Sequence, residues 1–163
     1  GVVGSTNVSS TGSGADIAHS PTCTTDASQL PAGATVRTCA LLKIVTGSAP
    51  GALSFKVKSG AAGNVLLSSS GATYVPSPGL SQTGWNCVTT VIGAVPGPAV
   101  ATYSAPETYA SGTTFPEDAN GTVQPVPLAT NGALIWNWVS RWESAGTGVN
   151  SVQLLALSVM MTR

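Results

Sequence analysis

Apolar and β-branched residues occur along the chain in short runs, each closed by a cluster of Gly and Pro. Residues 35–46 (TVRTCALLKIVT) form one such run, and in residues 52–58 (ALSFKVK) apolar side chains alternate with Ser and Lys. Alternation with a period of two predicts a strand with one face in the core and its lysines in water. Residues 47–51 (GSAPG) have turn composition, so we expect the two runs to form a β-hairpin.

Similar runs predict further strands, at residues 64–69, 73–75, 85–95, 99–104 and 122–128. No window of ten residues shows a clean apolar stripe of helical period with helix formers and caps. Gly and Pro, with 19 and 11 copies, divide the chain into strand-length pieces. This pattern predicts an all-β fold, an antiparallel β-sandwich that is jelly-roll-like, with a barrel as the alternative.

The first 33 residues are rich in Ser, Thr, Gly, Ala and Pro and show little apolar periodicity. We expect an extended arm with at most one short strand at residues 1–33, ahead of a single β-sandwich domain at residues 34–163. The first residues lack the charged and apolar regions of a signal peptide, so we expect Gly1 to mark the start of a processed or excised piece.

Three tryptophans fall within residues 133–142 (ALIWNWVSRW). As a strand, this run places Leu134, Trp136 and Trp138 on one face and Ile135 on the other. As a helix it would turn Trp136 outward, and it lacks an N-cap with a companion Glu or Gln. The pattern therefore favours a strand. Its aliphatic neighbours favour burial of the indoles in the core or in a subunit interface.

The last run, residues 149–162, is apolar at nearly every position. A strand of this kind is expected to lie between layers or beneath a partner. One face would carry Val152, Leu154, Ala156 and Met160, and the other Leu155, Leu157, Val159 and Met161.

Charge is scarce in this chain. Only 7% of its residues are charged, against about 25% in an average soluble domain. Six basic and six acidic residues give zero net charge, and the basic ones are scattered along the sequence. Nucleic-acid binding requires a clustered basic patch, so we expect no such contact from this segment. No apolar run reaches the roughly 18 residues of a membrane span.

The sequence does not specify which of the three cysteines, if any, form a disulfide. A bridge from Cys23 to Cys39 and three buried thiols, with Cys87 as the third, are both consistent with the sequence. No spacing suggests a zinc site. Sequons at Asn7 and Asn120 would allow glycosylation in a secretory setting.

Catalytic patterns are absent from the sequence. Any Ser–His–Asp triad must use His19, the single histidine, and no Gly-x-Ser-x-Gly elbow surrounds a serine. We therefore expect His19 to lie in an exposed loop and the protein not to be an enzyme. No two carboxylates are marked as a glycosidase pair. We expect Glu143 to form an ion pair with Arg141.

The sequence contains two further groups of candidate site residues. Glu117, Asp118 and Asn120 are candidate oxygen ligands for a hard cation such as calcium, although an Asx turn ahead of the next strand is the favoured interpretation, and we expect no other cofactor. Trp85, Trp136 and Trp138 would stack on sugar rings if they were exposed in a row.

With its low charge, its lack of predicted helices and its Ser-, Thr-, Gly- and Pro-rich loops, this chain resembles coat-protein domains of small non-enveloped RNA viruses, of the nodavirus and tetravirus kind. The resemblance rests on residues 125–128 (PVPL), 132–143 and 149–161. It implies a structural domain on the virion surface that self-associates into a symmetric homo-oligomer. Receptor or glycan contact would come from loop tips at residues 76–84 and 106–121.

The chain departs from a complete coat protein in lacking an Arg/Lys-rich arm and an autocleavage signature. These departures favour an outer, protruding domain over an inner shell domain. A secreted carbohydrate-binding module and a bacterial surface or pilus subunit are the alternatives.

Overall fold

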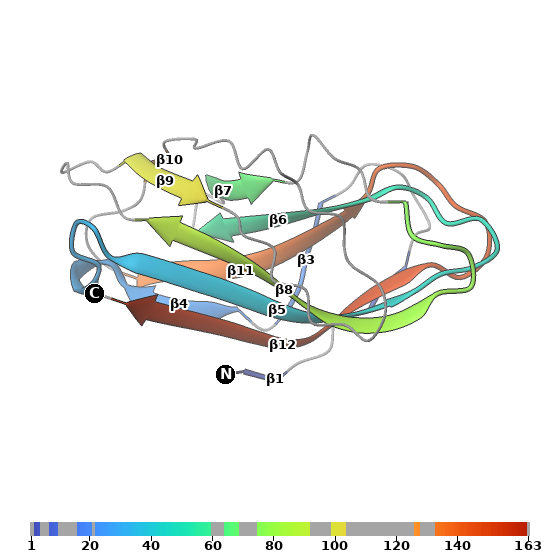
Figure 1. Cartoon of the computed structure of the whole chain (residues 1–163), viewed down its shortest axis with the longest axis horizontal. Coiled ribbons are helices and arrows are strands. Elements are labelled where there is room, and N and C mark those ends of the chain that lie inside the picture. The colour runs from blue at the N-terminus through green and yellow to red at the C-terminus, as the bar shows by residue number, and fades with distance from the viewer. Residues whose placement is uncertain are drawn as a thin grey trace.

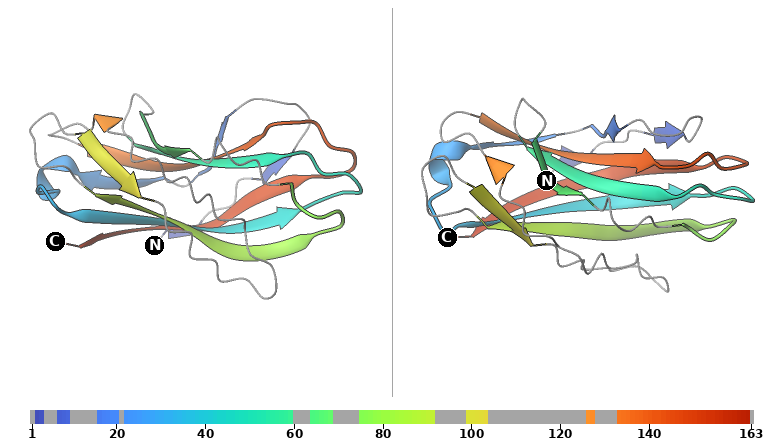
Figure 2. Two further views of the ribbon diagram at one scale, coloured as in Figure 1. Left: turned by 45° about the horizontal axis from the view of Figure 1, so that its top comes forward. Right: turned by 90° about the horizontal axis from the view of Figure 1, so that it is seen from above.

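The computed structural model describes residues 2–3, 7–9, 16–20, 22–59, 64–68, 75–91, 99–103, 126–127 and 133–162. Within these residues the chain forms two antiparallel β-sheets and no α-helix, with one 3₁₀ turn, η1, at Ala27–Gln29. The long strands of both sheets run along the same long axis of the molecule (Figures 1 and 2). The all-β prediction is confirmed, and the pair of antiparallel sheets fits a β-sandwich.

The larger sheet has seven strands in the order β1-β12-β5-β8-β9-β10, and β2 also pairs with β12. Its central strand β5 pairs with β8 and β12 over nearly its whole length. The strands are β1 Val2–Val3, β2 Asn7–Ser9, β5 Thr35–Val45, β8 Ser81–Val91, β9 Ala99–Tyr103, β10 Val126–Pro127 and β12 Ser151–Thr162.

The smaller sheet has five strands in the order β3-β11-β6-β7, and β4 also pairs with β11. The tryptophan-bearing run is its strand β11, so the strand prediction is confirmed there. The strands are β3 Ile17–Ala18, β4 Cys23–Asp26, β6 Leu53–Ser59, β7 Asn64–Ser68 and β11 Ala133–Trp142.

The predicted hairpin between β5 and β6 is wrong, because the two strands belong to different sheets. Their connection crosses from one layer to the other and packs against the β11–β12 connection at one end of the molecule (Figure 1). Ala49 forms an isolated bridge with Thr147, and the Gly47 amide donates to Asn150 Oδ1 at 3.0 Å. A Cβ at Gly51 would collide with the carbonyl oxygen of Ser144, so this close approach requires glycine.

Both sheets contribute their inner faces to one hydrophobic core. In β5, alternate side chains point into this core, so the apolar residues Val36, Ala40, Leu42 and Ile44 are buried. The other large members are Leu53, Phe55, Val57, Leu134, Trp136, Trp138, Trp142, Val152, Leu154 and Leu157.

Strand β12 contains a β-bulge that the sequence did not reveal. The register with β5 shifts between Leu154 and Ala156, so Leu155 is an extra residue. The bulge moves Leu157 to the inner face that Val152 and Leu154 occupy, and this corrects the predicted grouping of faces. Burial on both faces is also wrong at the end of the strand, where Met160 and Met161 are exposed.

The other strand boundaries differ by a few residues from those predicted from the sequence. β8 begins at Ser81, four residues before the predicted start, and Val75 lies outside any strand. The described parts of the predicted N-terminal arm contain four short strands and η1. β1 and β2 pair with β12, and β3 and β4 pair with β11. The domain boundary at residue 33 stays a prediction.

Candidate functional site

The tryptophans of β11 lie in the core. Trp136 and Trp138 are 0% and 1% exposed, whereas Ile135 on the opposite face is 38% exposed. The Trp136 Nε1–H donates to Thr25 Oγ1 at 2.8 Å, which links β11 to β4. The Phe55 ring lies 6.2 Å from that of Trp138, between centroids. Burial of these indoles in the core, favoured by the sequence, is confirmed.

In this core the indole N–H groups of Trp138 and Trp142 have no hydrogen-bond acceptor among the described residues. An unsatisfied buried donor costs about 1–3 kcal/mol. Burying an indole removes about 150–250 Å² from water, which is worth roughly 4–6 kcal/mol. Burial of the ring therefore outweighs the lost hydrogen bond, and these two residues serve packing.

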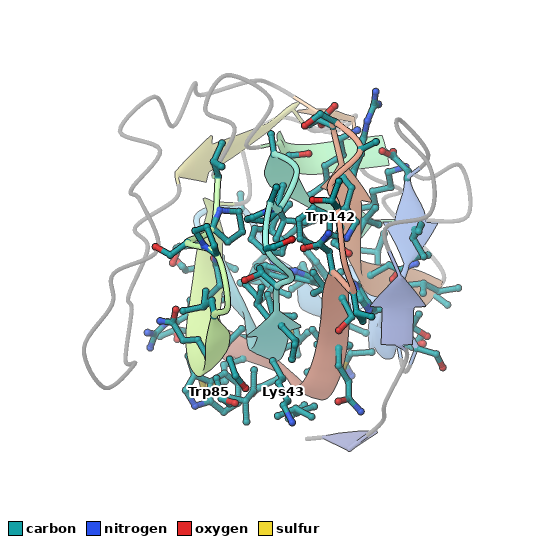
Figure 3. All side chains as sticks on the ribbon, turned by 90° about the vertical axis from the view of Figure 1, so that its right-hand side faces the viewer. Lys43, Trp85 and Trp142 are labelled. Atoms are coloured by element: carbon teal, nitrogen blue, oxygen red, sulfur yellow. A yellow bond between two sulfur atoms is a disulfide. The ribbon has the colours of Figure 1, made fainter. Side chains whose placement is uncertain are left out.

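Trp85 lies away from the other tryptophans, on the outer face of the seven-stranded sheet. It stands opposite Leu41 in the β5–β8 register and is half-buried. Figure 3 shows Trp85 and Lys43 projecting from the same border of the molecule, while Trp142 lies within it. Trp85, Trp136 and Trp138 therefore do not form an exposed row, and the predicted three-tryptophan sugar platform is wrong. Alternation along β11 turns two of its members inward.

His19 is buried, with 1% exposure, so the prediction of an exposed loop histidine is wrong. The β3–β11 register, which pairs Ala18 with Val139, carries His19 to the inner side of the sheet. Its amide donates to the Trp138 carbonyl at 2.9 Å. Its Nε2 lies 2.7 Å from the Ser140 hydroxyl, which is also fully buried.

A serine hydroxyl beside a histidine nitrogen is the geometry of an activated nucleophile. Here both groups lie inside the sandwich, where a substrate would have to displace core residues to reach them. This hydrogen bond therefore joins the residue that follows β3 to β11 and has a structural role.

A cluster of charged side chains, the Asp16 cluster, lies on the outer face of the five-stranded sheet. Asp16 Oδ1 accepts a hydrogen bond from Lys56 Nζ at 2.8 Å, and Oδ2 accepts one from Lys58 Nζ at 2.9 Å. Arg141 Nη1 lies 3.8 Å from Oδ1. The hydrogen bond from Lys56 is the main reason why the pKa of Asp16 is lowered, and Lys58 adds to it.

Glu143 completes the Asp16 cluster. Its Oε2 lies 2.9 Å from Arg141 Nε, and its Oε1 accepts the Ser54 hydroxyl at 2.5 Å. The predicted ion pair between Arg141 and Glu143 is confirmed. Basic residues that are scattered in sequence thus meet in space, and these three already have carboxylate partners.

The cysteines form a bridge that the sequence did not predict. Cys39 and Cys87 are register partners on β5 and β8 and are disulfide-bonded, while Cys23 is free and half-buried. A Cys23–Cys39 bridge and three free thiols are therefore both wrong. Pairing depends on the register of two strands far apart in sequence, which local patterns do not specify.

Other candidate residues lie outside what the structure describes. Glu117, Asp118 and Asn120 fall in residues 104–125, and the side chain of Asn7 in β2 is not described. Within the described ranges no group of three or more His, Cys, Asp or Glu side chains could hold a metal ion. A search of the same ranges finds no helix that is long and apolar enough to cross a membrane.

Sequence reasoning missed the Asp16 cluster. Alternation placed Lys56 and Lys58 on one strand face, which was a partial signal for this cluster. The approach of Asp16 to that face depends on the tertiary structure.

Comparison of the chain with protein-family models, with curated protein sequences and with solved structures found no match.

Proposed function

We propose that this chain is a structural domain of the coat protein of a small non-enveloped RNA virus. In this proposal it is a jelly-roll-like β-sandwich on the virion surface, and it acts by self-assembly and by contact with a host receptor or glycan. One observation carries the proposal. Among the described residues, His19 is enclosed against Ser140, and Asp16 is paired with Lys56 and Lys58, so these groups are not free for chemistry.

The low charge of the chain supports a role in repeated packing. Many copies placed side by side repel one another if each carries a large net charge, whereas this chain has a formal net charge of zero. Within the Asp16 cluster, three cations face two carboxylates, so even the charged patch is nearly balanced. Such an exterior suits symmetric contacts between like molecules.

The Cys39–Cys87 disulfide supports a location outside reducing compartments. Disulfides persist in extracellular settings and on virion surfaces, and they are rare in the cytosol. The virion-surface location is therefore consistent with the redox state of these two cysteines.

Loop tips are the proposed receptor contacts, because loops at the ends of a sandwich change most freely. Of the two predicted loop tips, residues 106–121 lie outside the described residues. The predicted bounds 76–84 are wrong at their end, because residues 81–84 belong to β8, so the loop comprises residues 76–80. This loop contains exposed residues such as Ser77 and Pro78 beside a turn at Gly79, whose φ is +66°.

Assembly is tested by light scattering coupled to size-exclusion chromatography, together with electron microscopy of negatively stained protein across a concentration series. We expect closed, symmetric oligomers or particles at high concentration. A monomer at every concentration would overturn the proposal. Open-ended filaments would also count against it and would favour a bacterial surface or pilus subunit.

Carbohydrate binding is the second candidate, and the half-buried Trp85 beside Leu41 is the observation that favours it. A single exposed indole can stack on one sugar ring. Retention on polysaccharide columns that is lost in Trp85→Ala, while the fold is kept, would support this candidate. Unchanged retention would remove it.

A further inference from the structure

The last residues of β12 lie on an edge of the seven-stranded sheet as far as the described residues show. On the side away from β5, β2 pairs with residues 151–153 and β1 pairs with Ala156 and Leu157. No described residue pairs with residues 158–162 on that side. In Figure 1, β12 forms the lower border of the sheet, with β1 beneath its middle. We call residues 158–162 the β12 edge.

The register shows which main-chain groups the β12 edge presents. Cys39 and Cys87 lie directly opposite each other with a Cα–Cα distance of 4.0 Å, which identifies a pair without mutual main-chain hydrogen bonds. The N–H and C=O of Cys39 therefore point to β12, where its partner is Ser158. Because these directions alternate along a strand, Val159 points its N–H and C=O away from β5, and so does Met161.

The side chains of the β12 edge offer no barrier to pairing. Natural proteins protect exposed edges with lysine, proline or a bulge, and the SVMMT sequence of residues 158–162 has none of these. The bulge of β12 lies earlier, at Leu155. Met160 and Met161, 45% and 44% exposed, project from opposite faces of the strand. An added strand would therefore cover apolar surface on both faces.

We propose that the β12 edge pairs antiparallel with the β12 edge of a second copy of this chain, with Met160 on the two-fold axis. In this register Val159 and Met161 of each copy form hydrogen-bonded pairs with Met161 and Val159 of the other. Met160 faces its own counterpart as a pair without main-chain hydrogen bonds. The two seven-stranded sheets then join into one.

A second copy suits this edge better than an unrelated partner. An antiparallel two-fold contact is self-complementary, and an uncharged segment meets itself without like-charge repulsion. The edge already accepts an antiparallel strand at the preceding position, where Val2 pairs with Leu157. This inference rests on the proposed self-assembly and names the surface that would carry it.

The contact is short, so the isolated pair of chains should associate weakly. In a symmetric assembly, where each copy makes several contacts, such a pair gains from the high effective concentration of its partner. The proposal therefore predicts association that rises steeply with protein concentration.

A proline at Met161 tests the main-chain pairing. It removes the outward N–H without removing a hydrogen bond to β5, and proline is tolerated where a strand faces solvent. Met161→Ala is the matched control, because it shortens the same side chain and keeps the N–H. By sedimentation velocity we expect Met161→Pro to weaken association about tenfold or more and Met161→Ala to weaken it less than about threefold. Equal effects of the two variants would overturn strand pairing.

Amide hydrogen exchange on the unmodified protein gives an independent reading. The amides of Val159 and Met161 should exchange slowly at assembling concentrations and quickly on dilution, while those of Ser158 and Met160 stay protected by β5 in both. Fast exchange at Val159 and Met161 in the assembled protein would overturn the proposal, even if the proline variant failed to fold.

The register is tested by Met160→Cys, which should form a disulfide between two copies under mild oxidation. Thr162→Cys is the control and should cross-link more slowly, because in this register Thr162 lies opposite Ser158 of the other copy and not opposite itself. If the protein assembles but neither exchange nor cross-linking involves the β12 edge, this inference fails while the coat-protein proposal stands. If the protein stays monomeric at every concentration, both fail.

Discussion

Lys56 Nζ donates a hydrogen bond to Asp16 Oδ1 at 2.8 Å, across 40 positions of sequence, and this contact ties the residue before β3 to the outer face of β6. Lys58 binds the other oxygen of the same carboxylate. Asp16 thus anchors an early segment of the chain to the sheet through two ammonium groups.

The Asp16 cluster should make stability depend on acid pH. The pKa of Asp16 is lowered in the folded state. The stabilisation from its ion pairs is therefore fully present above the ordinary carboxyl pKa of about 3.9 and is lost as the pH falls through the pKa of the folded state. We expect Asp16→Asn to lower the free energy of unfolding at pH 7 and to have no effect at strongly acidic pH, as measured by urea denaturation.

Asp26→Asn is the matched control for this prediction. The pKa of Asp26 is also lowered, by hydrogen bonds from the Ser28 hydroxyl and amide, with no lysine involved. High salt should therefore reduce the effect of Asp16→Asn and leave that of Asp26→Asn nearly unchanged. An equal salt response of the two variants would contradict the assignment.

The Cys39–Cys87 disulfide should contribute substantially to stability. It closes a loop with a sequence separation of 48, for which chain entropy predicts about 4 kcal/mol. We expect the double variant Cys39→Ser, Cys87→Ser to lose about 2–4 kcal/mol of unfolding free energy in denaturant titrations. Cys23→Ser, at the free thiol, is the control, and a comparable loss there would count against this account.

The buried and outer tryptophans should differ in their cost of removal. Trp136→Ala should cost about 3–5 kcal/mol, because it leaves a cavity in the core. Trp85→Ala should cost about 1–2 kcal/mol, because its indole is only partly withdrawn from water. Iodide quenching of fluorescence checks the placement directly: most of the quenching should disappear in Trp85→Ala, and its persistence would contradict the outer position.

The Ser140 hydroxyl should matter for stability and not for turnover. Ser140→Ala leaves a buried imidazole nitrogen without this hydroxyl and should cost about 1–3 kcal/mol. Ser48→Ala, at an exposed position, is the control and should cost little. A screen against ester and peptide substrates should show the same background for wild type and Ser140→Ala. Hydrolysis that disappears in Ser140→Ala would contradict the structural role.

Amino-acid alternation alone was sufficient to predict several strands and the direction of their side chains. It assigned Trp136 and Trp138 to one face of β11, which is the core face, and it predicted β5 and β6 nearly to their ends. These features depend on the spacing of apolar residues along a single strand, because apolar side chains are buried. That preference is local, so the sequence states it directly.

Only the tertiary structure decided which segments meet. β5 and β6 would show the same alternation if they paired in one sheet or if they faced each other from two sheets. Alternation therefore could not distinguish a hairpin from the observed crossover between sheets. The bulge at Leu155, the Cys39–Cys87 bridge and the approach of His19 to Ser140, 121 positions later, all depend on strand register. Register is set by the joint packing of distant strands around one core, and the free energy of that packing belongs to no single stretch of sequence.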